Sequence, residues 1–220
     1  VIESRGLGDV YKRQVYPNTV RHDFYKDKKV DRDLEKKYSK EFVITYVGNT
    51  SKRRGLLTVI DSLKIIQKTI PNIKLLIIGK SSFDQVIKDK VKQNQIEKLV
   101  DFIGWIKESD IPNYLSISKL GLSPLHKNIH HDTTYANKVF QYISFGCPIV
   151  SSNVIAQSEL VNKYKIGVIF EDNNAFDLSN KIIELHNDKN LYNRLKQNCL
   201  DSIEKLNNGV ISNQLISIYE

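Results

Sequence analysis

The chain has 220 residues, of which 40% are hydrophobic and 26% charged, a composition typical of a soluble globular protein with a sizeable core. No run of apolar residues approaches the roughly eighteen that a membrane-spanning helix needs. The net charge of +8 is spread among acidic residues, and there is no RNP-like motif, zinc-finger spacing or base-reading basic helix. This argues against nucleic acid as a partner and favours a solvated surface with one local anion site.

The first fourteen residues, VIESRGLGDVYKRQ, include the string GLGDVYKRQ, which resembles a recurrent translated adapter or assembly artefact. The chain also contains no methionine, even at position 1. We therefore expect residues 1–14 to be non-native and leave them out of the fold. Residues 15–220 are expected to form one domain of a longer protein.

Beyond a charged segment, Lys26–Lys40, that predicts a surface linker or short helix, apolar runs of strand length alternate with segments of helical periodicity. The expected strands are Phe42–Val47, Ile73–Ile78, Leu99–Ile103, Lys119–Ser123, Pro148–Ser152 and Val168–Phe170. The expected helices are Gly55–Ile70, Phe83–Gln95, Asp110–Ser118, Asn137–Gly146, Gln157–Lys163, Ala175–His186, Leu191–Leu206 and Val210–Ile218. The alternation predicts the α/β class, with a doubly wound, Rossmann-like parallel sheet covered on both faces.

Ligands of such sheets bind beyond the carboxyl ends of the strands. Four loops are expected at this edge: Gly48–Arg54, Gly79–Ser82, Gly104–Lys107 and Leu125–Asn137. The last loop is dense in His, Asp and Thr and runs directly into an expected helix. Since the free N–H groups and the dipole of a helix N-terminus attract anions, this loop predicts a phosphate-bearing ligand.

Four motifs, in order and at sensible intervals, carry a resemblance that spans roughly Val15 to the C-terminus. They are VYPNTV (15–20), YVGNTSKRRGLLTVIDSL (46–63), LLIIGK with DFIGWI (75–80 and 101–106), and NKVFQYISFGCPIVSS (137–152). Together they resemble the C-terminal, donor-binding domain of a family 4 (group 1) retaining glycosyltransferase of the GT-B fold. That resemblance implies a nucleotide-diphosphate sugar as donor substrate, no metal or other cofactor, and glycosyl transfer with retention by the full-length enzyme.

The resemblance also implies roles for particular residues. Arg54 and Lys138 would hold the diphosphate, whose charge grows as the glycosidic bond breaks, and Gln141 would hold the ribose; these three are the expected catalytic residues. Other donor contacts are expected from residues of the four loops: Gly48, Asn49, Gly79, Lys80, Trp105, Ile106, His126, Thr133, Thr134 and Tyr135. Of these, Thr133, Thr134 and Tyr135 would face the sugar, whereas Trp105 and Lys80 would line the base pocket.

This sequence departs from the family pattern at three positions. Asn49 stands where the family often has an Arg, and Lys52, Arg53 or Lys138 could supply the missing cation. Thr133 and Gln141 align with the two Glu residues of the family signature, so both carboxylates are absent. Two alternatives therefore stay open: a non-catalytic nucleotide-sugar-binding module, and a sugar-nucleotide epimerase of GT-B architecture. A basic nucleic-acid-binding module is a third, less favoured one.

A cluster of His126, His130, His131 and Asp132 invites a metal-site interpretation, but a loop that binds sugar hydroxyls needs polar groups too, and we expect no metal. Cys147 and Cys199 are expected to be reduced and buried, since they lack CxxC spacing.

The parent enzyme is expected to contain an N-terminal acceptor-binding domain that is missing here, so this chain alone should bind nucleotide without transferring sugar. We expect the enzyme to be cytoplasmic, with peripheral association at the inner face of the membrane as an open alternative.

Overall fold

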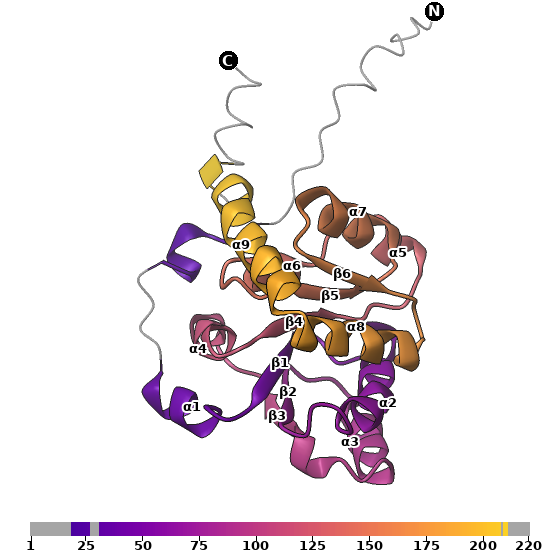
Figure 1. The fold of residues 1–220 in the computed structure, drawn as a ribbon. Coiled ribbons are helices and arrows are strands. Elements are labelled where there is room, and N and C mark those ends of the chain that lie inside the picture. Colours follow the sequence, from indigo (N-terminus) through magenta and orange to yellow (C-terminus); the bar gives the residue numbers. More distant parts are fainter. Residues whose placement is uncertain (1–18, 27–30, 208, 211–220) are drawn as a thin grey trace, which may run out of the picture.

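The fold is an α/β domain built around one parallel sheet (Figure 1). The structure is a computed structural model that describes residues 19–26, 31–207 and 209–210. Six strands form the sheet in this part of the chain: β1 (Phe42–Val47), β2 (Ile73–Ile78), β3 (Val100–Gly104), β4 (Leu120–Ser123), β5 (Ile149–Ser152) and β6 (Gly167–Phe170). Their order is β3-β2-β1-β4-β5-β6 and every pairing is parallel, which confirms the predicted doubly wound sheet.

The helices that the structure describes are α1 (Arg32–Lys37), α2 (Leu56–Ile66), α3 (Asp84–Gln93), α4 (Ile111–Ser116), α5 (Ile129–Asp132), α6 (Asn137–Ile143), α7 (Ile155–Tyr164), α8 (Ala175–Asn187) and α9 (Lys189–Leu206). The expected strands and helices are thus confirmed within a few residues, and the charged segment before β1 contains the short helix α1. The segment 15–18 and most of the expected last helix, 211–218, lie outside the described residues, as do residues 1–14.

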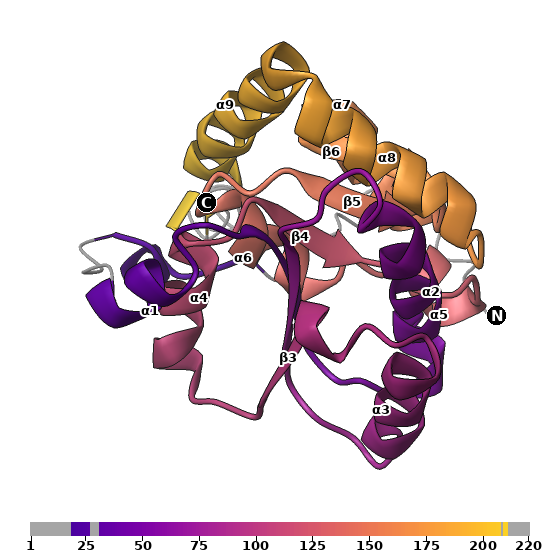
Figure 2. The same cartoon turned by 60° about the horizontal axis from the view of Figure 1, so that its bottom comes forward.

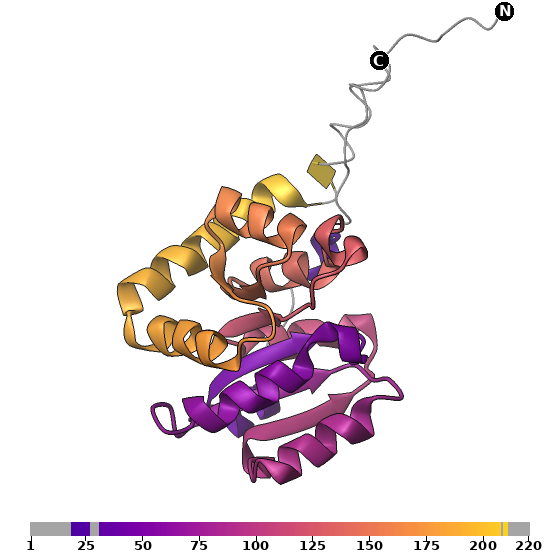
Figure 3. The same ribbon diagram turned by 90° about the vertical axis from the view of Figure 1, so that its right-hand side faces the viewer.

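Helices cover both faces of the sheet (Figure 2). The side chains of α2, α3 and α8 form one apolar core with the strands, and those of α4, α6, α7 and α9 form a second core against the opposite face. Figure 3 shows α2 and α3 lying along the β1–β3 half of the sheet. Strand β1 (FVITYV) is buried along almost its whole length because it is central and covered twice, which explains its continuous apolar sequence.

The order of the strands reverses between β1 and β4, since β2 follows β1 on one side and β4 lies on the other. These two strands pair only at Ile44 with Leu120 and at Thr45 with Gly121, so they separate before their carboxyl ends. A crevice outside such a reversal point is where doubly wound sheets bind ligands.

The described helices include none long and apolar enough to cross a membrane.

Candidate nucleotide-sugar site

The gap between the carboxyl ends of β1 and β4 is bridged by the side chain of Tyr142 on α6. Its hydroxyl accepts a hydrogen bond from Val47 N–H (2.9 Å) and donates one to the carbonyl of Leu122 (3.0 Å). The ring fits because Gly121 has no side chain, and a Cβ there would lie 2.2 Å from the ring. One phenol therefore satisfies backbone groups that the diverging strands cannot pair with each other, and it fixes α6 at the switch point.

The ends of β1, β2 and β3 form a rim of closely packed backbone. Gly48 N–H donates to the carbonyl of Ile78 (2.8 Å), and Gly79 N–H donates to the carbonyl of Gly104 (2.7 Å). Gly79 has a φ of +129°, and a Cβ on it would lie 1.9 Å from the Gly48 carbonyl oxygen. Only glycine fits at position 79, where it lets the backbone at the end of β1 approach the end of β2.

Arg54 is placed by the turn that joins β1 to α2. Residues Lys52–Arg54 form a 3-10 turn, and Gly55 then adopts a left-handed conformation with a φ of +73°. A Cβ on Gly55 would lie 1.7 Å from the carbonyl oxygen of Pro124, so this glycine lets the turn pack against the end of β4. The Arg54 Nε atom is buried and has no hydrogen-bond partner in the described part of the chain.

Lys138, in the first turn of α6, is also buried, with 6% of its surface exposed. Its Nζ atom lies 3.9 Å from the centre of the Tyr46 ring and has no hydrogen-bond partner among the described residues. Burial, and then the charge of Arg54, lower the pKa of Lys138 well below its ordinary value. Two cationic side chains with unsatisfied donors thus converge, an arrangement that an anion would stabilise.

These two side chains line one pocket of about 380 Å³. The other residues of its wall come from the β1 end, from the loop after β4 and from α6: Val47, Gly48, Asn49, Leu125, His130, His131, Thr134, Tyr135, Ala136, Asn137 and Gln141. We call it the cationic pocket. The pocket therefore gathers seven of the predicted site residues: Gly48, Asn49, Arg54, Thr134, Tyr135, Lys138 and Gln141.

A second pocket of about 340 Å³ shares the β1 end with the first and continues over β2 and β3. Its wall consists of Val47, Gly48, Asn49, Ile78, Gly79, Lys80, Trp105, Ile106 and Ile111. Trp105 is 67% exposed, so it presents a free aromatic face rather than packing into the core. We call this the aromatic pocket. It holds the remaining predicted residues from the β2 and β3 loops, Gly79, Lys80, Trp105 and Ile106.

Two predicted residues lie outside both pockets. Thr133 is exposed, and its hydroxyl donates to the carbonyl of Ile129 within the loop (2.8 Å). His126 is turned toward the start of the loop after β6, where its Nδ1 lies 2.7 Å from a carboxylate oxygen of Asp172. In the free protein the contacts of both side chains are therefore internal to the fold.

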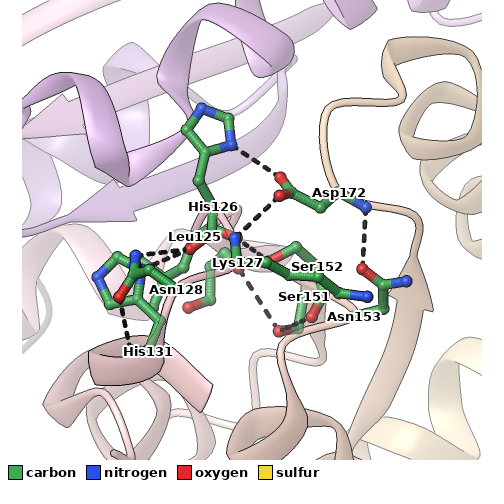
Figure 4. A network of polar contacts seen from close by, with 10 residues as sticks. Leu125, His126, Lys127, Asn128, His131, Ser151, Ser152, Asn153 and Asp172 are labelled. Carbon is green, nitrogen blue, oxygen red and sulfur yellow. Dashed lines mark hydrogen bonds and ion pairs between the residues drawn. The ribbon is translucent and has the colours of Figure 1, made fainter.

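The loop after β4 is more ordered than the sequence predicts, because it contains the short helix α5. Asn128 caps this helix by accepting a hydrogen bond from His131 N–H (3.0 Å), and Asp132 accepts one from Ile155 N–H at the start of α7 (3.0 Å). Asp172 ties down the other end of the loop by accepting from Lys127 N–H (2.9 Å), as Figure 4 shows. The loop is thus held to both α7 and the β6 end.

His126 hydrogen-bonds to Asp172, and Nδ1 of His131 to the carbonyl of His126. The described residues contain no group of three or more His, Cys, Asp and Glu side chains that could hold a metal ion. Cys147 and Cys199 are both buried and free, as predicted.

Sequence reasoning missed three residues that shape the site. Tyr46 and Tyr142 look like core residues of an apolar strand and helix, and only the fold shows that one lies under Lys138 and the other bridges two strands. Asp172 is separated from His126 by 46 positions, so no local pattern connects them.

The family of glycosyl transferases group 1 matches residues 27–200. The chain therefore belongs to this glycosyltransferase family, and its fold has the form of the C-terminal half of a GT-B enzyme.

Among curated proteins, the chain is similar to the capsular polysaccharide biosynthesis glycosyltransferase CapM of Staphylococcus aureus. The two are 27% identical over 195 residues, which cover 84% of this chain and 49% of CapM. The chain thus spans about half the length of this relative.

Two solved structures show the same fold. HepE of Anabaena in complex with UDP superposes with a TM-score of 0.81 at 17% identity, over 94% of this chain and 57% of HepE, and it has also been solved with UDP-glucose. The C-terminal domain of the group 1 family protein LpcC of Francisella tularensis superposes with a TM-score of 0.63 at 19% identity, over 86% of this chain and 94% of that domain.

Proposed function

We propose that this chain is the donor-binding half of a retaining glycosyltransferase and that its cationic pocket holds the diphosphate of a nucleotide sugar. The observation that carries the proposal is a pair of buried donor atoms in one pocket, Arg54 Nε and Lys138 Nζ, neither of which has a hydrogen-bond partner among the described residues. A buried cation without a partner destabilises the free protein, and an anionic ligand would supply the missing partner. A diphosphate leaving group also gains charge in the transition state, where preorganised cations lower the barrier.

The two pockets share Val47, Gly48 and Asn49, so one nucleotide sugar could occupy both, with different parts of the ligand in each pocket. We propose that the base stacks in the aromatic pocket beside Trp105, with Lys80 and Ile106 at its edge. The diphosphate then crosses the glycine rim to Arg54 and Lys138. Gln141 would meet the ribose, and Thr134 and Tyr135 would face the sugar.

UDP is the first nucleotide to test, since the HepE structures contain UDP and UDP-glucose. Because this chain spans about half of CapM, we propose that a separate N-terminal domain binds the acceptor and that residues 15–220 form the donor domain. The chain alone is then expected to bind nucleotide and to transfer no sugar. Turnover of a nucleotide sugar by the isolated chain would contradict this.

The proposal is tested by isothermal titration of the chain with UDP, GDP and ADP in the absence of metal. We expect saturable binding of one diphosphate, and a loss of tenfold or more for Arg54→Ala, because charge-assisted bonds to phosphate contribute about 1.5–3 kcal/mol. Arg194→Ala is the matched control, because Arg194 is an exposed arginine on α9 that lines neither pocket. Failure of a folded sample to bind any of the three would overturn the proposal.

A second candidate is a nucleotide-sugar binder without catalysis. It is favoured by the absence of a carboxylate at Thr133, whose hydroxyl is engaged within its own loop, and at Gln141. The two candidates differ in the full-length protein: binding that depends on Arg54 without glycosyl transfer to any acceptor would select the second.

A further inference from the structure

His131 has a buried nitrogen atom that the proposed diphosphate contacts do not use. The side chain is 2% exposed and lies in the wall of the cationic pocket. Its Nε2 atom is buried without a hydrogen-bond partner in the part of the chain that the structure describes. Buried polar atoms are nearly always paired, so this atom points to a group that is supplied from outside the chain.

The partners of His131 determine which kind of group this is. The Nδ1 atom lies 2.7 Å from the carbonyl oxygen of His126, and a carbonyl can only accept a hydrogen bond. We assign the proton to Nδ1, because the opposite tautomer would place its lone pair against those of the carbonyl oxygen at the shorter of its two contacts. The Asn128 amide nitrogen, 2.8 Å from Nδ1, donates to the same carbonyl (3.0 Å). In the neutral ring, Nε2 is then an acceptor, on the edge of the ring away from the loop network (Figure 4).

The charges around the ring disfavour a metal ion as the missing partner. Arg54 and Lys138 line the same pocket, and a divalent cation beside them would be strongly repelled. A phosphate oxygen without a proton cannot donate to Nε2 either. A neutral donor fits Nε2, and besides water the neutral donors that a nucleotide sugar carries next to its diphosphate are the hydroxyl groups of the sugar and the ribose.

We propose that Nε2 of His131 accepts a hydrogen bond from a hydroxyl group of the bound nucleotide sugar and thereby contributes to donor selection. The network of Figure 4 holds the ring for this task, because Asp172 anchors Lys127 and His126, whose carbonyl group orients Nδ1. This inference rests on the proposed donor site. It adds to that site a residue that recognises a hydroxyl group of the ligand rather than its charge.

Two substitutions of His131 distinguish the role of Nδ1 from that of Nε2. His131→Asn keeps a donor near the position of Nδ1 and loses the acceptor at Nε2, whereas His131→Gln reaches the position of Nε2 with an amide oxygen. If His131 were only structural, Asn would preserve binding better than Gln. The proposal predicts the reverse order. His186→Gln is the matched control, because His186 packs on the Phe42 ring at the amino end of β1, at the opposite edge of the sheet.

The experiment is isothermal titration of the wild-type chain and these variants with UDP and UDP-glucose, with thermal unfolding measured for each. Loss of one neutral hydrogen bond is expected to weaken binding about fivefold to tenfold in His131→Asn, with substantial recovery in His131→Gln. A loss for UDP-glucose alone assigns the bond to the sugar, and an equal loss for both ligands assigns it to the ribose. Folded His131→Asn that binds both ligands like the wild type would overturn the inference while leaving the diphosphate site intact. A wild-type chain that binds neither of these ligands, and neither GDP nor ADP, would instead overturn the proposed function.

Discussion

The Lys138 ammonium lies 3.9 Å above the centre of the Tyr46 ring, buried between α6 and the end of β1. The face of the ring attracts the cation, but it offers none of the hydrogen bonds that the ammonium had in water. Arg54 adds a second positive charge to the same pocket. In the free protein the site is therefore electrostatically unfavourable, and this property leads to several measurable consequences.

Removing the buried charge should stabilise the fold while it destroys the site. We expect Lys138→Met to raise the free energy of unfolding of the ligand-free chain by about 1–3 kcal/mol, because an unpaired buried charge is replaced by an apolar chain of similar length. Affinity for UDP should fall tenfold or more. Denaturant unfolding and titration calorimetry measure the two effects. Lys163→Met, at an exposed position, is the control and should leave both unchanged. Destabilisation by Lys138→Met would show that the ammonium is satisfied in the free protein.

Binding of a diphosphate should be coupled to the uptake of a proton by Lys138. Burial lowers the pKa of Lys138 in the free protein, and an adjacent diphosphate raises it again, so between these two values the ligand binds together with a proton. Affinity should then fall as the pH rises through that window. Between the pKa of Lys138 in the folded free protein and its pKa in the unfolded chain, the unfolded chain binds more protons than the folded one. The stability of the free protein therefore rises with pH in this range.

The proton uptake is measured by titration in two buffers with different ionisation enthalpies, at a pH where UDP itself no longer titrates. Wild type should show uptake and Lys138→Met none. Equal uptake by both proteins would assign the proton to another group.

The bridge that Tyr142 forms between β1 and β4 should be needed for stability. Tyr142→Phe leaves the buried N–H of Val47 and the carbonyl of Leu122 without this partner, which should cost about 1–3 kcal/mol in unfolding free energy. Because Val47 lines both pockets, UDP affinity should also fall. Tyr164→Phe serves as control, because Tyr164 lies at the end of α7 and lines neither pocket. Wild-type stability of Tyr142→Phe would contradict the bridging role.

Two rim glycines with positive φ should differ in their tolerance of a methyl group. A Cβ at Gly79 would lie 1.9 Å from the Gly48 carbonyl oxygen, whereas a Cβ at Gly104 meets nothing within 4 Å. Both substitutions strain the backbone, but only Gly79→Ala must also push two loops apart. We expect Gly79→Ala to lose about 2 kcal/mol more unfolding free energy than Gly104→Ala. Equal losses would mean that backbone conformation alone requires glycine.

Much of the fold follows from local sequence, because strands buried on both faces are continuous apolar runs that end at glycine. Both β1 and β2 occupy the predicted residues, Phe42–Val47 and Ile73–Ile78. Helix α5 was not predicted, since its four residues show no apolar periodicity and its stability depends on distant contacts such as that of Asp132 with Ile155.

The loops of the candidate site were predicted correctly as a group, because parallel strands bring their carboxyl ends to one edge. The directions of individual side chains could not be read from the sequence. His126 pairs with a carboxylate 46 positions away, and Thr133 bonds within its own loop. The placement of His131 likewise depends on a backbone carbonyl that only the folded loop brings within reach.

The central claim is that Arg54 and Lys138 hold a diphosphate, and a crystal structure of the chain with UDP tests it most directly. We predict phosphate oxygens within hydrogen-bonding distance of both Arg54 Nε and Lys138 Nζ, with the base beside Trp105. UDP bound elsewhere, or bound with both of these groups still unpaired, would contradict the account.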